Sequence, residues 1–179
     1  MFSRFVATIA AVATACVSIP SAEAALNHTA IVEKLQAIGV TTSYGKCAGD
    51  GHNDPSGVLG SYNSRDNHFC ISESVTTTQL LDEVVVHELV HVVQDCIGGG
   101  IASPNLGSIT RYLSSGDTVH ENILDQGLIG TLLRQNKMDH VKQYTSHMPD
   151  SAKFTEIEAY SLENSPLFVL KLLSKCNPQ

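Results

Sequence analysis

The sequence predicts an α+β fold, a mostly helical single domain with a small antiparallel sheet placed before its longest helix. Helical spacing of apolar residues runs through most of the chain, and two short strand-like segments flank a turn at residues 63–67. The length of 179 residues suits one domain, and 42% hydrophobic with 16% charged residues is typical of a folded globular protein. We therefore expect one hydrophobic core.

The first 24 residues have the pattern of a signal peptide. Arg4 precedes an apolar run over residues 5–19, and Ala22-Glu23-Ala24 gives a small-x-small cleavage pattern. An uncleaved membrane anchor is the alternative. We expect a signal peptide at 1–24, a mature domain over 25–179, a secreted or periplasmic location, and no stable membrane span after cleavage.

The net charge of −7, with 11 basic and 18 acidic residues, argues against a nucleic-acid partner, because phosphate binding needs clustered basic residues. Four cysteines follow the signal segment: Cys47, Cys70, Cys96 and Cys176. An even number in an exported chain predicts two disulfides, with three possible connectivities. We favour Cys47–Cys70 and Cys96–Cys176, which pair sheet with sheet and helix end with helix end. A cysteine zinc cluster is the weaker interpretation, since no C-x-x-C spacing occurs.

The elements are predicted in the following order. A helix over 28–38 ends at Gly39, and a polar, turn-rich stretch covers 40–57. Strands are expected at 58–62 and 68–72, before a long apolar helix over 76–97 that ends at three glycines. Residues 102–116 are expected to be irregular, and the remaining helices are expected at 118–135, 138–147, 152–163 and 167–175.

The segment His87-Glu88-Leu89-Val90-His91 carries the strongest chemical signal. Histidines four residues apart lie one turn apart on one face of a helix, where both imidazoles can bind a single Zn²⁺. Glu88 lies beside the first ligand, so its carboxylate can take a proton from a water molecule on the metal and pass it to the leaving amine. Apolar residues cover nearly every side of this helix, so unpaired polar groups there would be costly, and a divalent cation would offset that cost. A coincidental match, with histidines that hydrogen-bond within the core, is the alternative.

A catalytic zinc needs a third protein ligand. No histidine follows His91 closely, and Thr155-Glu156-Ile157-Glu158-Ala159 offers two carboxylates on a predicted helix. They point about 200 degrees apart, so only one can face the metal. We favour Glu156 over Glu158, because the small Ala159 one turn beyond Glu156 allows a close helix approach. A solvated helix face is the alternative.

The H-E-L-V-H segment, followed by Cys96 after four intervening residues, resembles the metalloprotease family that processes a subunit of mitochondrial ATP synthase. That family has a similar H-E-L-[IV]-H-x-x-x-x-C stretch and a later S-E-I-R-A stretch, to which residues 155–159 are similar. Gly60-Ser61-Tyr62-Asn63 and the Cys70 strand are similar to the segment before its active helix. The resemblance implies a zincin-like fold of the gluzincin type, zinc-dependent endopeptidase activity, and Glu156 as the third ligand.

The chain departs from this family in two respects. About sixty residues separate His91 from Glu156, where the family has a short connection, so residues 98–150 are predicted to be an insertion or a different architecture. The signal peptide also predicts export, not mitochondrial import.

We therefore expect an exported zinc endopeptidase that acts on a protein or peptide substrate. The metal ligands would be His87, His91 and Glu156, and Glu88 would be the general base and acid. The strand at 68–72 could hold an extended substrate. Other side chains could donate a hydrogen bond to the transition state or accept one from a zinc-bound imidazole. The donors are Tyr160, His147, His140 and Tyr112, and the carboxylates are Asp95 and Asp125.

Two other functions fit the same sequence. One is a secreted, disulfide-stapled helical binding domain with structural zinc or none. The other is a metallohydrolase that acts on a non-peptide amide, such as a cell-wall link.

Overall fold

The computed structural model describes residues 26–47, 58–99 and 106–176. The predicted signal peptide at 1–24 lies outside these residues. Within them, no helix combines the length and the apolar character that a membrane span requires.

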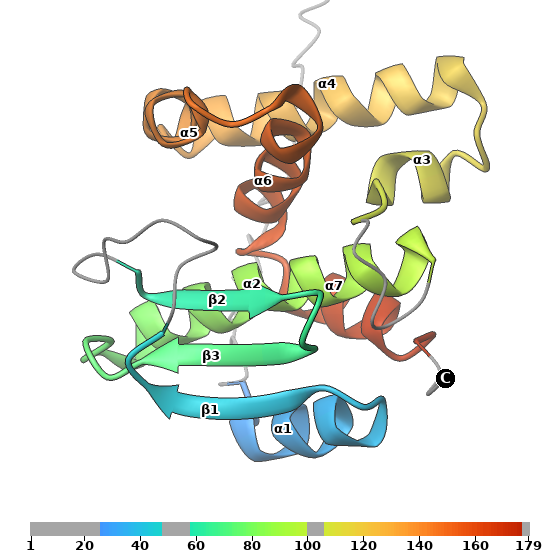
Figure 1. Ribbon diagram of the computed structural model, residues 1–179. Coiled ribbons are helices and arrows are strands. Elements are labelled where there is room, and N and C mark those ends of the chain that lie inside the picture. Colours follow the sequence, from blue (N-terminus) through green and yellow to red (C-terminus); the bar gives the residue numbers. More distant parts are fainter. Residues whose placement is uncertain (1–25, 48–57, 100–105, 177–179) are drawn as a thin grey trace, which may run out of the picture.

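The chain is mostly helical with one small sheet, which confirms the predicted α+β class (Figure 1). The described elements are α1 (His28–Ala37), β1 (Thr41–Gly45), β2 (Gly60–Asn63), β3 (His68–Ser72), α2 (Thr78–Gly98), α3 (Ile109–Leu113), α4 (Thr118–Arg134), α5 (Met138–Thr145), α6 (Asp150–Leu162) and α7 (Pro166–Leu173). The predicted long helix and the helices predicted after residue 117 are confirmed, with ends within about two residues.

The sheet is mixed, so the prediction of a purely antiparallel sheet is wrong. Its strand order is β1-β3-β2, with β3 antiparallel to β2 and parallel to β1. The extra strand β1 comes from a segment predicted to be turn-rich. Its threonines and its tyrosine favour an extended chain, and hydrogen bonding to β3, which is distant in the sequence, makes the segment a strand.

Residues 102–116 were predicted to be irregular, which is wrong for the short helix α3. The side chain of Ser108 caps this helix by accepting a hydrogen bond from the amide of Arg111. A single cap starts only five helical residues here, and the tertiary contacts of α3 with α2 and α4 hold them in place.

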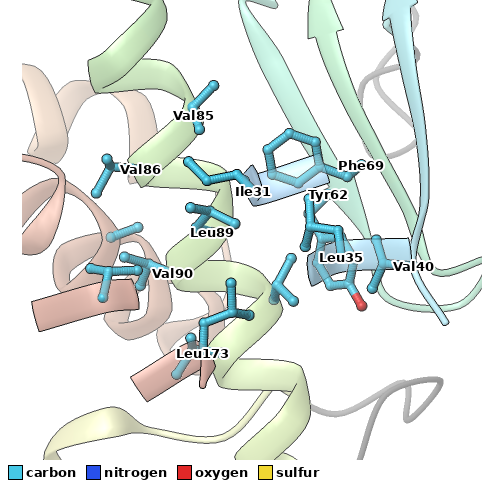
Figure 2. Packing of buried hydrophobic residues seen from close by; sticks show 14 of the residues in the cluster. Ile31, Leu35, Val40, Tyr62, Phe69, Val85, Val86, Leu89, Val90 and Leu173 are labelled. Atoms are coloured by element: carbon cyan, nitrogen blue, oxygen red, sulfur yellow. The ribbon is translucent and has the colours of Figure 1, made fainter. Parts of the chain in front are cut away.

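Helix α2 is the centre of the fold. It starts where the side chain of Thr77 accepts a hydrogen bond from the Leu80 amide. The sheet covers one side of α2, and α6 and α7 pack on other sides, which explains its apolar residues all round. Leu89 and Val90 are fully buried between the sheet and the C-terminal helices (Figure 2).

Both predicted disulfides are confirmed. Cys47–Cys70 joins the residues after β1 to the central strand β3, with a Cα–Cα distance of 5.6 Å. Cys96–Cys176 joins the last turns of α2 to the residues after α7, with a Cα–Cα distance of 5.8 Å. The first bond fixes the sheet and the second fixes the C-terminus on α2.

The segment predicted to be an insertion, 98–150, supplies α3, α4 and α5. Helices α4 and α5 contact α6 and lie on its far side from the sheet (Figure 1). Helix α6 is thus held between these helices and α2, which positions it to present side chains to His87 and His91.

Candidate metal centre

The structure brings the three predicted ligands together from two helices. His87 and His91 lie one turn apart on α2, and Glu156 reaches them from α6. His87 Nε2 is 3.4 Å from Glu156 Oε2, and His91 Nε2 is 3.4 Å from Glu156 Oε1. One ligand atom from each residue fits within 4.8 Å of the other two, so the group could hold a metal ion.

Both histidine–carboxylate distances, each to a different oxygen of Glu156, have the length expected between two ligands of a tetrahedral ion. Ligand atoms about 2.0–2.2 Å from such an ion lie roughly 3.3–3.6 Å from one another, which matches both histidine–carboxylate distances. Glu156 Oε2 is also buried and accepts no hydrogen bond from the described residues, although His87 lies at ion-pair distance. A buried carboxylate oxygen in this state has a lone pair to offer a cation.

The second nitrogen of each imidazole is held by another side chain. His87 Nδ1 lies 3.2 Å from Glu163 Oε2, and Glu163 forms an ion pair with Lys137. His91 Nδ1 lies 2.8 Å from Gln94 Oε1. These contacts fix both rings with Nε2 toward Glu156, as hydrogen bonds to the outer nitrogen of a metal-binding histidine commonly do.

Glu163 and Gln94 were missed by the sequence analysis, which suggested Asp95 and Asp125 for this purpose. Asp95 Oδ2 accepts a 2.6 Å hydrogen bond from the Tyr62 hydroxyl on the sheet. Helical spacing could have found the two actual partners. Gln94 lies one turn after His91, and Glu163 lies two turns after Glu156.

Glu158, the alternative ligand, is directed elsewhere. Its fully buried carboxylate accepts hydrogen bonds from Gln94 Nε2 (2.9 Å), the Ile109 amide (3.0 Å) and the Thr110 amide (2.9 Å). The hydroxyls of Ser108 and Thr110 also donate to it. Glu158 therefore anchors the start of α3 and, through Gln94, supports His91.

Glu88 is buried and lies against the first residue of β2. A Cβ added to Gly60 would lie 2.9 Å from Glu88 Cγ, 3.1 Å from Glu88 Oε1 and 2.6 Å from Val84 Cγ1. Only glycine fits here without a shift, and its small size lets the backbone of β2 approach the Glu88 carboxylate.

The carboxylates of Glu88, Glu156 and Glu163 favour positive charge at His87. Burial alone would lower the pKa of His87, but the neighbouring carboxylates of Glu156 and Glu163 and the charge of Glu88 raise this pKa to about 10. Burial opposes the ionised form of Glu156, yet His91 and His87 lower the pKa of its carboxyl group. Without a metal, the carboxylates around His87 therefore favour its protonated form.

Of the four donor candidates, Tyr160 contacts the ligand His87, and His140 contacts Tyr160. The Tyr160 ring packs edge-on against His87 with centroids 4.5 Å apart, and its hydroxyl is 3.4 Å from His140 Nε2. Burial, and then the charge of Glu156, raise the pKa of Tyr160 above its usual value. His147 is exposed after α5, and Tyr112 lines a separate cavity beside α3.

Comparisons with models of known protein families, with curated proteins and with solved structures find no match to this chain. What the protein does is therefore inferred from the residues of the site. In this site two imidazoles and the carboxylate of Glu156 lie close enough to bind one metal ion, and Glu88 is a further buried carboxylate on α2.

Proposed function

We propose that this protein is an exported, zinc-dependent endopeptidase. The observation that carries the proposal is the convergence of His87, His91 and Glu156 on one point, with Glu88 following directly after the first of them on α2. The two disulfides are compatible with export.

Zinc suits this donor set, since two imidazole nitrogens and one carboxylate leave a fourth tetrahedral position open. When bound, Zn²⁺ would polarise the carbonyl of the scissile bond and make a water molecule more acidic. His87, His91 and Glu156 would hold it, and Glu163 and Gln94 would keep the imidazoles in place through their Nδ1 atoms.

Glu88 is the proposed general base and acid. It takes a proton from the attacking water and passes it to the leaving amine nitrogen as the peptide bond breaks. It does not belong to the converging group of ligand atoms, so it can serve the reaction while His87, His91 and Glu156 hold the metal.

Among the described strands, β2 is the edge strand beside the site to which an extended peptide would pair. The strand predicted to hold substrate, β3, is the central strand with partners on both sides, so that prediction is wrong. The Ser72 amide donates to the Leu59 carbonyl, so the alternating main-chain groups of Gly60 and Tyr62 point away from β3. Within the described residues no strand covers this edge, and a peptide added there would pass Glu88 beside Gly60.

The test compares purified wild-type protein with Glu88→Gln on a denatured casein-type substrate. The variant should lose activity by about 10²–10⁴-fold because the proton acceptor is removed, while its zinc content stays unchanged. Glu83→Gln, on the same helix and partly exposed, is the matched control and should keep activity.

Unchanged cleavage by Glu88→Gln would refute the role of Glu88. A wild-type protein that holds zinc but cleaves neither proteins nor peptides would favour the binding-domain alternative. Cleavage of peptidoglycan without proteolysis would favour hydrolysis of a non-peptide amide.

A further inference from the structure

Helix α4 presents an apolar row that no other described element covers. Val119, Ile123 and Leu133 are 65%, 61% and 59% exposed. With Gln126 and Gly130 they are spaced four, three, four and three residues apart. This is the a/d spacing of a helix that packs lengthwise against another helix. The buried side of α4, marked by Leu132, faces the rest of the molecule.

Contacts among the described residues do not explain the two glycines of α4. A Cβ added at Gly127 would meet nothing within 4 Å, and one at Gly130 would meet only the end of the Arg134 side chain at 3.5 Å. Glycine in a helix interior lowers helix stability, so a neighbour outside the chain is a reason to keep it. At Gly130 the missing side chain would let another helix approach closely.

The row is complementary to itself when a second copy runs antiparallel. Val119 and Leu133 each lie seven positions from Gln126, so each faces the other residue across a two-fold axis at Gln126. Ile123, three positions from Gln126, then falls opposite Ile129 of the partner, an apolar side chain that is 42% exposed.

The charges at the two ends of α4 are also complementary in this arrangement. Asp117 caps the first turn with its side chain about half exposed, and Arg134 stands exposed in the last turn. Antiparallel pairing brings Asp117 of one copy next to Arg134 of the other at both ends, whereas parallel pairing would place like charges together.

We propose that α4 is the dimer interface of this protein, and that it pairs antiparallel with α4 of a second copy. The inference does not depend on the proposed peptidase activity. Helices of 17 residues are about 25 Å long, and a single pair buries less than the roughly 1,000 Å² of a stable interface. The dimer is therefore weak, with a dissociation constant on the order of 10–100 µM.

Cross-linking tests the two-fold axis directly. Gln126→Cys places two cysteines beside the axis, so a short bis-maleimide should join the copies. Thr118→Cys, equally exposed on α4 but about 25 Å from its copy in the dimer, is the matched control and should not be joined. Equal cross-linking of both variants would overturn the register, and cross-linking of neither would overturn the interface.

Sedimentation velocity tests the contact in solution, from about 5 to about 500 µM protein. Wild-type protein should pass from monomer to dimer over this range. Ile123→Glu and Leu133→Glu should each weaken dimerisation at least about tenfold. Leu167→Glu, at an 82% exposed apolar position on α7, should not.

A monomer at every concentration would overturn the proposal. A monomer that sediments with anionic lipid vesicles through α4 would overturn it in favour of a membrane contact. A dimer as sensitive to Leu167→Glu as to Ile123→Glu would show that α4 is not its interface.

Discussion

Glu156 and Glu158 on α6 are only two residues apart, but we expect different effects when each is removed. Removal of Glu158 should lower the stability of the fold, and removal of Glu156 should abolish zinc binding. In Glu158→Ala, the amides of Ile109 and Thr110 and one N–H of Gln94 lose their buried acceptor. Each stranded donor costs about 1–2 kcal/mol, so we expect a loss of about 3–6 kcal/mol in the free energy of unfolding. For a domain of this size, Tm should fall by about 6–24 °C.

Glu156→Ala is the matched comparison, because no hydrogen-bond donor depends on its Oε2 and His87 can release its proton. Without metal, we expect a smaller loss in its free energy of unfolding than in that of Glu158→Ala, because His87 loses one of its two carboxylate partners but no backbone amide is stranded. The affinity of Glu156→Ala for zinc should be lost. Urea unfolding in the presence of a chelator, followed by zinc titration, measures both effects. Equal destabilisation by the two variants, or loss of zinc in Glu158→Ala without destabilisation, would refute the assignment of roles.

Three more predictions follow from the contacts of the site and the disulfides. Glu163→Gln should weaken zinc binding about 10–100-fold, because His87 Nδ1 loses a charged partner. A competition assay with a chromophoric chelator measures this loss. Glu83→Gln, which removes another contact of Lys137, should leave zinc binding unchanged. The pKa of His87 is raised from 6.5 to about 10, so its contribution to the stability of the metal-free protein is full below pH 6.5 and is lost as pH rises toward 10. Urea unfolding of the chelated protein at several pH values should show this decline, and His87→Gln should remove it. Replacing Cys96 and Cys176 with serine should cost about 1 kcal/mol more than replacing Cys47 and Cys70, since the sequence separations are 80 and 23 residues; equal unfolding free energies for the two double variants would contradict this.

The centre of the fold could be predicted from the sequence because its signals are local. The apolar residues and glycine stop of α2 mark its extent, and the spacing of His87 and His91 places them on one face whatever the surroundings. The small Ala159 indicated a close approach between α6 and α2, and it is fully buried.

The missed features depend on contacts between distant segments. β1 is a strand because Thr41–Gly45 pairs with His68–Ser72, and no local pattern states that pairing. Helix α3 starts where the buried Glu158 accepts its first amides. A polar residue in a helical pattern predicts a solvated face unless its partner is known, so this carboxylate could not be assigned from the sequence.

The coordination of zinc in the purified protein tests the central claim most directly. We predict one zinc per chain, with X-ray absorption showing two imidazole nitrogens at about 2.0–2.1 Å and a carboxylate oxygen at about 2.0–2.2 Å. The carboxylate signal should be lost in Glu156→Ala. A folded protein that takes up no zinc when it is supplied, or whose zinc keeps the same ligands in His87→Ala, would contradict the account.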